Sequence, residues 1–221
     1  MKITHLYIAA AIAVLGTTSC VDLDRYPLEE LSDKSFWRSP DDAEKAVSNL
    51  YTSLPYWDVD DAINSDDAVH GIKWAAGNIS KGVYDPQDFG WKENYAAIRK
   101  ANIVLSKVNL IPNYDGEKKN RVLGQAYFFR ALQYFNLIRS YGDVPYVDKP
   151  LSLSDQEGIV RTPREEVYGK VMQDFDKAIE YLPKSWSSSE YGRVTKGAAL
   201  AMKARDRKST RLNSSHPAGS R

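Results

Sequence analysis

Apolar residues recur along most of this chain three or four positions apart, the spacing of one face of an α-helix. No segment shows a clear alternation of apolar and polar residues of the kind that marks a half-buried strand. The pattern predicts an all-α fold in which helices form antiparallel pairs joined by long irregular loops. The expected helices cover residues 40–54, 91–109, 117–141, 163–182 and 197–204, and a short helix is expected over 62–74.

Capping residues mark several of the expected helix ends. Ser39 followed by Pro40 is a favourable helix start, and Gly142 stands where a glycine commonly closes a helix. The run Thr162–Glu165 has the form of a capping box. It predicts Thr162 as the N-cap of the helix that follows.

Polar residues interrupt the apolar stripes of two long helices. Asn102 lies in the stripe of helix 91–109, and Arg130 lies in the stripe of helix 117–141. A buried amide or guanidinium needs hydrogen-bond partners. We therefore expect both residues to be buried structural groups that do not contact a ligand.

Two of the predicted helices are spaced like the two helices of a tetratricopeptide repeat. The residues concerned are Leu123, Gly124 and Tyr127 in the first helix and Phe175, Ala178 and Pro183 in the second. The long insert 142–161 breaks the usual period of that repeat. Two unrelated amphipathic helices explain the spacing equally well.

The N-terminus has the pattern of an export signal. An apolar run, Leu6–Leu15, is too short for a permanent transmembrane helix and is followed by small residues and by Cys20, the sole cysteine. This arrangement resembles a bacterial lipoprotein signal, although Thr17 stands where that pattern prefers an aliphatic residue. We expect residues 1–19 to be the signal peptide, Cys20 to carry the lipid and residues 20–38 to be a tether. The alternative is a secretory signal with an incidental cysteine.

The C-terminal residues 206–221 differ from the chain before them. They are rich in Ser and Arg and lack helical periodicity. They resemble translated read-through of a sequencing adapter. We therefore expect a non-native tail after an incomplete helical domain over 39–205. The alternative is a disordered basic tail.

Charge and composition exclude several classes of function. The chain has 30 Lys and Arg residues against 29 Asp and Glu residues, so its formal net charge is +1 and no strong global field attracts nucleic acid. One cysteine permits neither an intramolecular disulfide nor a cysteine-based zinc cluster, and three histidines leave little basis for histidine chemistry. We expect no cofactor, no metal and no nucleic-acid partner.

Five motifs follow one another in an order that resembles a known family. They are FWRSPDDA at 36–43, NYAAIRKAN at 94–102, GQAYFFRA at 124–131 in the helix that ends in YGDVP at 141–145, RTPREEVY at 161–168 and GRVTKGAA at 192–199. Together they resemble the N-terminal part of the SusD/RagB family of surface glycan-binding lipoproteins of Bacteroidetes. Gln125 stands where the family has a glutamate.

The resemblance implies a fold, a location and a partner. Family members have a tetratricopeptide-like helical scaffold with irregular loops, and a lipid holds them at the outer membrane, facing outward. They bind oligosaccharide for a TonB-dependent transporter of the SusC type and perform no chemistry. The same properties are therefore expected of this chain.

The loop segment 57–91 contains the residue types that recognise sugars. Flat aromatic faces suit the C–H surfaces of sugar rings, and Asp or Asn can bind their hydroxyl groups. Small residues follow Trp74 and would let a ligand approach, so we expect Trp74 to stack on a sugar; Trp91 lies on an apolar stripe and is expected in the core. The candidate ligand-binding residues are Trp57, Asp66, Asp67, Trp74, Asn78 and Tyr84.

Two other classes of function compete with glycan binding. Catalysis is not expected. The acidic pairs Asp60/Asp61 and Asp66/Asp67 are neighbours in sequence, and such neighbours rarely face one another across a glycoside. A Ser–His–Asp mechanism would depend on His70 alone, and the sequence has no nucleophile-elbow motif. The alternative that stays open is a helical-repeat lipoprotein that binds peptide or another non-glycan nutrient for the same type of importer.

Overall fold

Five α-helices account for most of the residues that the computed structural model describes, namely 36–54, 89–152 and 154–214. They are α3 (Pro40–Leu50), α5 (Trp91–Lys107), α6 (Gly116–Tyr141), α7 (Arg164–Tyr181) and α8 (Lys196–Ser214). Within these ranges the β-structure is limited to one isolated antiparallel bridge, between Val144 and Thr162. The prediction of an all-α fold is confirmed. The short helix expected over 62–74 lies outside the described residues.

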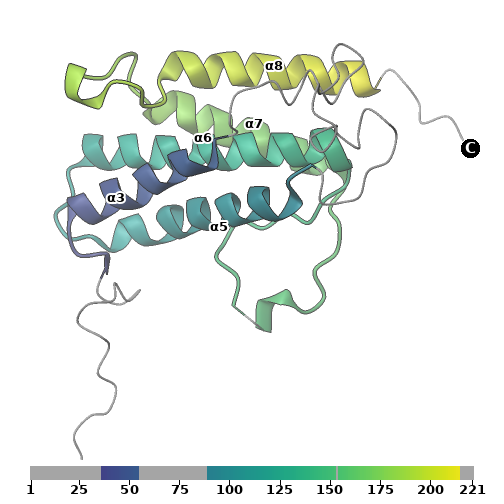
Figure 1. Ribbon diagram of the computed structural model, residues 1–221, viewed down its shortest axis with the longest axis horizontal. Helices are drawn as coiled ribbons and strands as arrows, with labels where there is room; N and C mark the ends of the chain where they lie inside the picture. Colours follow the sequence, from purple (N-terminus) through teal and green to yellow (C-terminus); the bar gives the residue numbers. More distant parts are fainter. Residues whose placement is uncertain (1–35, 55–88, 153, 215–221) are drawn as a thin grey trace, which may run out of the picture. The chain divides into compact units, whose positions relative to one another are not determined.

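Successive helices lie side by side and reverse direction (Figure 1). All five belong to one unit, Trp37–Arg221. α6 packs against α5 on one side and α7 on the other, α8 covers α7, and α3 rests on both α5 and α6. The predicted antiparallel pairing is therefore present, and α6 is the central helix.

Because α6 is central, its buried residues are not confined to one apolar stripe. From Gly124 to Ile138, every residue except Tyr127 and Asn136 is buried. The consecutive residues Phe128 and Phe129 are both buried. Neighbouring helices lie on several sides of α6, so most of its circumference is removed from water.

Gln125 is one of the polar residues enclosed by this packing. Its side-chain oxygen accepts a hydrogen bond from the Tyr51 hydroxyl at 2.7 Å, and its amide donates to the carbonyl of Arg121 at 3.1 Å. The Tyr51 hydroxyl in turn accepts from the backbone N–H of Val194 at 2.9 Å. Gln125 therefore links the end of α3 to α6 and to the loop before α8.

The predicted cap of α7 is wrong. The helix begins at Arg164, and the side chain that accepts from the Arg164 N–H, at 2.9 Å, is Asp143. Thr162 is instead engaged in the bridge to Val144, and its hydroxyl accepts from the N–H of Tyr146 at 3.3 Å. The bridge holds Thr162 outside the helix, and a residue 21 positions earlier takes over the cap.

α8 also departs from the prediction. It continues through Ser214, whereas the expected helix ended at Ala204. Arg, Lys and Leu are good helix formers, so a helix continues without an apolar stripe. Leu200 and Ala201 are exposed, as expected for the outer face of the last helix, while Ala198 and Met202 are half-buried.

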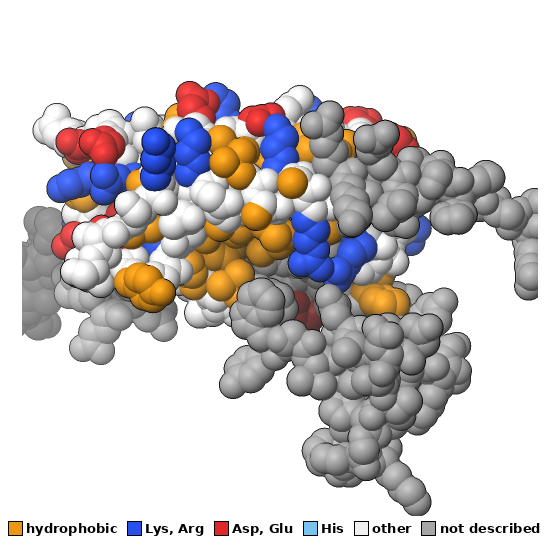
Figure 2. Space-filling view, turned by 90° about the horizontal axis from the view of Figure 1, so that it is seen from above, with side chains coloured by type: hydrophobic (Ala, Val, Ile, Leu, Met, Phe, Trp, Pro, Cys, Tyr) orange, Lys and Arg blue, Asp and Glu red, His pale blue; other side chains and the backbone are white. Residues whose placement is uncertain are grey.

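The surface that includes α8 carries both signs of charge. Figure 2 shows Lys and Arg interspersed with Asp and Glu on the face seen from above. This mixture agrees with the near-zero net charge of the sequence. No helix among the described residues is long and apolar enough to cross a bilayer.

A close contact between α6 and α7 provides a test of the fold. A Cβ atom at Gly124 would lie 3.0 Å from Leu182 Cγ and 3.2 Å from the Leu182 backbone nitrogen. We expect Gly124→Ala to lower the free energy of unfolding by about 1–3 kcal/mol, because overpacking outweighs the better helix propensity of alanine.

The control is the matched change in α7. A Cβ atom at Gly169 would meet nothing within 4 Å, so Gly169→Ala is expected to stabilise the chain by about 0.5–1 kcal/mol. Urea denaturation of both variants measures the difference. Equal effects of the same sign would contradict the close α6–α7 contact.

Candidate functional site

The candidate ligand-binding residues predicted from the sequence all lie outside the described residues. They are Trp57, Asp66, Asp67, Trp74, Asn78 and Tyr84, and the predicted lipidation site Cys20 lies outside as well. Trp91, which was expected in the core, is half-buried at the start of α5. Its ring centroid lies 4.9 Å from those of Tyr95 and Tyr141, so it packs in an aromatic cluster.

A buried ion pair joins α6 to α7. Arg130 and Asp174 are 7% and 5% exposed, and the guanidinium donates two parallel hydrogen bonds of 2.7 Å from Nε and Nη2 to the two carboxylate oxygens. Burial alone would lower the pKa of Arg130, but the hydrogen bonds and charge of Asp174 outweigh it and raise that pKa. The guanidinium is therefore held charged between the two helices.

The remaining donor of Arg130 extends this pair to α5 and to the loop after α6. Nη1 donates to Asn102 Oδ1 at 2.9 Å and to the carbonyl of Asp148 at 3.3 Å. The Asn102 amide then donates to the carbonyls of Val147, at 2.9 Å, and Lys149, at 3.4 Å. The prediction that Asn102 and Arg130 are buried structural groups with partners is confirmed.

Two tyrosines also form hydrogen bonds with the backbone of this loop. The Tyr134 hydroxyl donates to the Val147 carbonyl at 2.9 Å and accepts from the Val147 N–H at 2.6 Å. The Tyr95 hydroxyl donates to the Pro145 carbonyl at 2.7 Å. Burial raises the pKa of both phenols, so they remain protonated donors at neutral pH.

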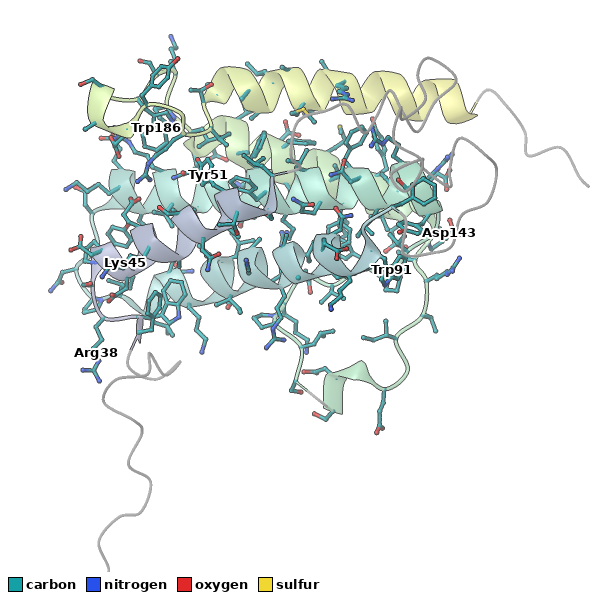
Figure 3. All side chains as sticks on the ribbon, viewed as in Figure 1. Arg38, Lys45, Tyr51, Trp91, Asp143 and Trp186 are labelled. Atoms are coloured by element: carbon teal, nitrogen blue, oxygen red, sulfur yellow. The ribbon has the colours of Figure 1, made fainter. Side chains whose placement is uncertain are left out.

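The YGDVP motif at 141–145 closes the ends of three helices. Gly142 has a φ of 72°, which lets the chain turn out of α6, and Asp143 caps α7. Val144 forms the bridge to Thr162, and Pro145 receives the Tyr95 hydroxyl. Figure 3 shows Trp91 and Asp143 at this common end of the helices. Gly142, Asp143, Val144 and Pro145 therefore each have a structural role at this end of the helices.

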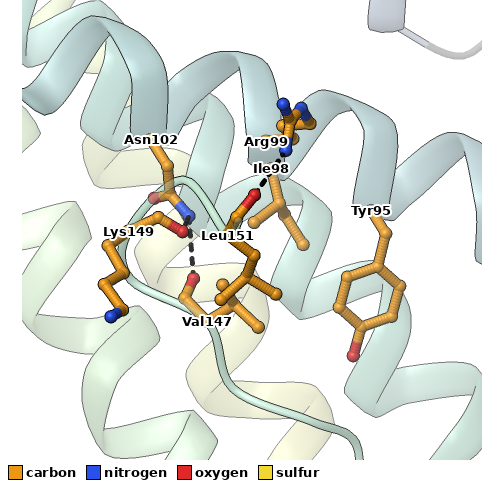
Figure 4. A pocket seen from close by; sticks show the side chains of 7 residues that line it. All are labelled: Tyr95, Ile98, Arg99, Asn102, Val147, Lys149 and Leu151. Carbon is orange, nitrogen blue, oxygen red and sulfur yellow. Dashed lines mark hydrogen bonds between the residues drawn. The ribbon is translucent and has the colours of Figure 1, made fainter. Parts of the chain in front are cut away.

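A pocket of about 160 Å³ opens between α5 and the loop that this network holds (Figure 4). Its lining is formed by Tyr95, Ile98, Arg99, Asn102, Val147, Lys149 and Leu151. Pockets for drug-sized ligands measure about 300–1,000 Å³, so this one holds a single small group. The pocket is the candidate site among the described residues.

The pocket is apolar within and cationic at its rim. Ile98, Val147 and Leu151 lie between the charged ends of Arg99 and Lys149 (Figure 4). Arg99 donates to the Leu151 carbonyl at 3.1 Å, which ties the rim to α5. No group of three or more metal-binding side chains occurs among the described residues.

Sequence reasoning missed two parts of this site. Arg130 was expected to need a partner, but its pairing with Asp174 in α7 was not predicted. Opposite charges in the stripes of consecutive helices were the available signal. The role of Tyr95 carried no such signal, because a tyrosine on an apolar stripe usually only packs.

Similarity to known proteins identifies the family of this chain. A family model described as "Starch-binding associating with outer membrane" and named SusD-like matches residues 39–206. The chain belongs to the SusD-like family. The resemblance given by the five sequence motifs is confirmed, since all of them except the first three residues of FWRSPDDA fall within the match.

Individual relatives agree with the family match. SusD-like protein P2 of Formosa agariphila is 32% identical over 86% of this chain and 41% of its own length. A SusD-like protein of Bacteroides fragilis superposes with a TM-score of 0.69 at 30% identity, covering 82% of this chain and 37% of that one. A laminarin-binding SusD-like protein has the same fold, with a TM-score of 0.68 at 24% identity over 76% of this chain and 40% of that one. The chain thus spans about 41% of the length of its curated SusD-like relative.

Proposed function

We propose that this SusD-like chain binds oligosaccharide at the cell surface and delivers it to a TonB-dependent transporter of the SusC type. The observation that carries the proposal is the match of residues 39–206 to a family described as starch-binding and associated with the outer membrane.

The loop network supports a binding role. Side chains from α5 and α6 fix the backbone of residues 145–149 through hydrogen bonds from Tyr95, Asn102 and Arg130. A loop that is fixed before the ligand arrives loses little conformational entropy on binding. Such a loop is suited to recognition by shape.

The aromatic platform of segment 57–91 belongs to the same proposal. Trp74 stacks on a sugar ring, and Asn78 hydrogen-bonds one of its hydroxyl groups. The remaining candidate ligand-binding residues are Trp57, Asp66, Asp67 and Tyr84. This part rests on residue types and spacing in the sequence alone.

The proposed activity is glycan binding without cleavage. The experiment distinguishes it from glycan hydrolysis and from peptide binding. The purified full chain is tested for retention in gels containing soluble polysaccharides, with laminarin first because one structural relative is named for binding it. The same glycans are then analysed for shortened products, and a peptide mixture is tested in parallel. We expect retention by at least one glycan without product. Release of products would indicate an enzyme, and binding of peptides alone would favour the importer of non-glycan nutrients.

Anchoring through Cys20 is the localisation part of the proposal. The cysteine follows an apolar run and small residues, so it is the expected acceptor of lipid. Cys20→Ala is expected to move the protein from the membrane fraction to the soluble fraction, because stable anchoring requires the acyl chains. Fractionation with detection of the protein measures this. A variant that still sediments with outer membranes and dissolves only in detergent would contradict lipidation at Cys20.

A further inference from the structure

We propose that the pocket between α5 and residues 147–151 binds one acidic sugar unit, whose carboxylate or sulfate is bound by Arg99 and Lys149. The inference rests on the proposed glycan-binding function and names a ligand class for it. It concerns residues other than the candidates predicted in segment 57–91.

The size of the pocket fits one ring. An apolar cavity of about 150 Å³ is known to hold benzene, a six-membered ring. The pocket here measures about 160 Å³ and is open at one side. It therefore takes one pyranose-sized unit of a glycan, and the neighbouring units remain outside.

The floor suits the C–H face of a sugar. Ile98, Val147 and Leu151 present aliphatic groups that lie together in the centre of the pocket (Figure 4). Tyr95 adds an aromatic ring at one end of this floor. Apolar contact of this kind positions a ring but does not select its substituents.

The polar groups of the pocket favour an anion. Asn102 could bind a neutral hydroxyl, but its oxygen accepts from Arg130 and its amide donates to the Val147 and Lys149 carbonyls. The side chains that remain are those of Arg99 and Lys149. A guanidinium and an ammonium are donors only, and their strongest partners are carboxylate and sulfate-like oxygens.

Both cations keep donors for a ligand. Arg99 donates a hydrogen bond to the Leu151 carbonyl, which leaves most of the five N–H groups of its guanidinium. Lys149 is 64% exposed, and its ammonium contacts Asp155 at 3.0 Å. An acidic ligand therefore shares Lys149 with Asp155.

The wider surroundings do not cancel this preference. Burial raises the pKa of Tyr95, and the charge of nearby Arg161 opposes that rise. The loop between α6 and α7 carries the carboxylates Asp143, Asp148, Asp155 and Glu157, of which Asp143 caps α7 and Asp155 pairs with Lys149. Arg130 below the loop is neutralised by Asp174. The residues that line the pocket include Arg99 and Lys149 and no carboxylate.

The test compares charged glycans with uncharged forms of the same glycans. Polygalacturonate is paired with its fully methyl-esterified form, and a sulfated galactan is paired with its desulfated form, so the arms distinguish carboxylate from sulfate. Binding to the full chain is measured by titration calorimetry at low ionic strength, because salt screens exposed charges. At least one charged glycan is expected to bind more tightly than its uncharged form.

Variants of pocket residues then test whether the preference for charged glycans arises in the pocket. Arg99→Gln with Lys149→Gln is expected to weaken binding of the charged glycan at least about tenfold, since charge-assisted hydrogen bonds are lost. Lys92→Gln removes an exposed charge from α5 away from the pocket lining and is expected to leave binding unchanged. Asp155→Asn frees Lys149 and is expected to tighten binding.

The outcomes separate this inference from the proposed function. If neutral glycans bind and no charged form binds more tightly, or if the double variant binds like Lys92→Gln, the acidic-sugar pocket is wrong and glycan binding stands. If no glycan binds, the proposed function fails and the inference fails with it. A weaker affinity of Asp155→Asn for the charged glycan would also contradict the assigned geometry.

Discussion

Asp174→Asn is expected to lower the free energy of unfolding by about 3–5 kcal/mol, the cost of leaving a buried charge without its partner. Asp174 is 5% exposed and accepts two hydrogen bonds of 2.7 Å from Arg130. An amide in its place offers one acceptor oxygen and no charge, so the guanidinium of α6 remains buried and uncompensated. Urea denaturation followed by circular dichroism measures the loss.

Two companion variants make this prediction specific. Glu180→Gln breaks the ion pair to Lys177 on the same helix, where the side chains are 57% and 49% exposed, and is expected to cost less than about 1 kcal/mol. Asp174→Leu combined with Arg130→Met removes both buried charges and is expected to recover most of the lost stability. Equal losses for Asp174→Asn and Glu180→Gln would mean that the buried pair does not join the helices.

Trp91→Ala and Trp74→Ala are expected to affect different properties. Trp91 packs its ring against Tyr95 and Tyr141 at centroid distances of 4.9 Å, so its loss is expected to cost about 3 kcal/mol of stability, the lower end of the range for aromatic residues. Trp74 is proposed to stack on the ligand, and its loss is expected to weaken glycan binding by about 1–3 kcal/mol, the magnitude known for stacking on nucleic-acid bases.

The two variants are measured together in the full chain. Each is tested for its thermal midpoint and for its affinity toward a glycan that the unaltered chain binds. The expected result is a lower midpoint for Trp91→Ala and a lower affinity with an unchanged midpoint for Trp74→Ala. The reverse pattern would place the sugar at Trp91 and Trp74 in the core.

The helices were predictable because their residues repeat with a clear period. α5 and α6 begin and end within two residues of the expected positions. The environment of α6 was harder to predict, because a helix surrounded by others is buried well beyond one stripe. The N-cap of α7 was missed because Asp143 is distant in sequence, and local capping rules consider only neighbouring residues.

The candidate site was predictable only in its parts. Asn102 and Arg130 were recognised as buried groups that need partners, and their partners proved to be Asp174 and the backbone of 147–149. The pocket itself was not foreseen. It depends on how a loop without regular structure lies over α5, and that path is fixed by hydrogen bonds between residues far apart in the chain.

Hydrogen–deuterium exchange of the full chain, measured with and without a glycan that it binds, locates the ligand on the chain. We expect slower exchange in segment 57–91, and with a charged glycan also in residues 145–151, while the backbone amides at the centre of α6 remain unchanged. Slower exchange confined to other surfaces, such as the loop 183–195, would contradict both proposed sites.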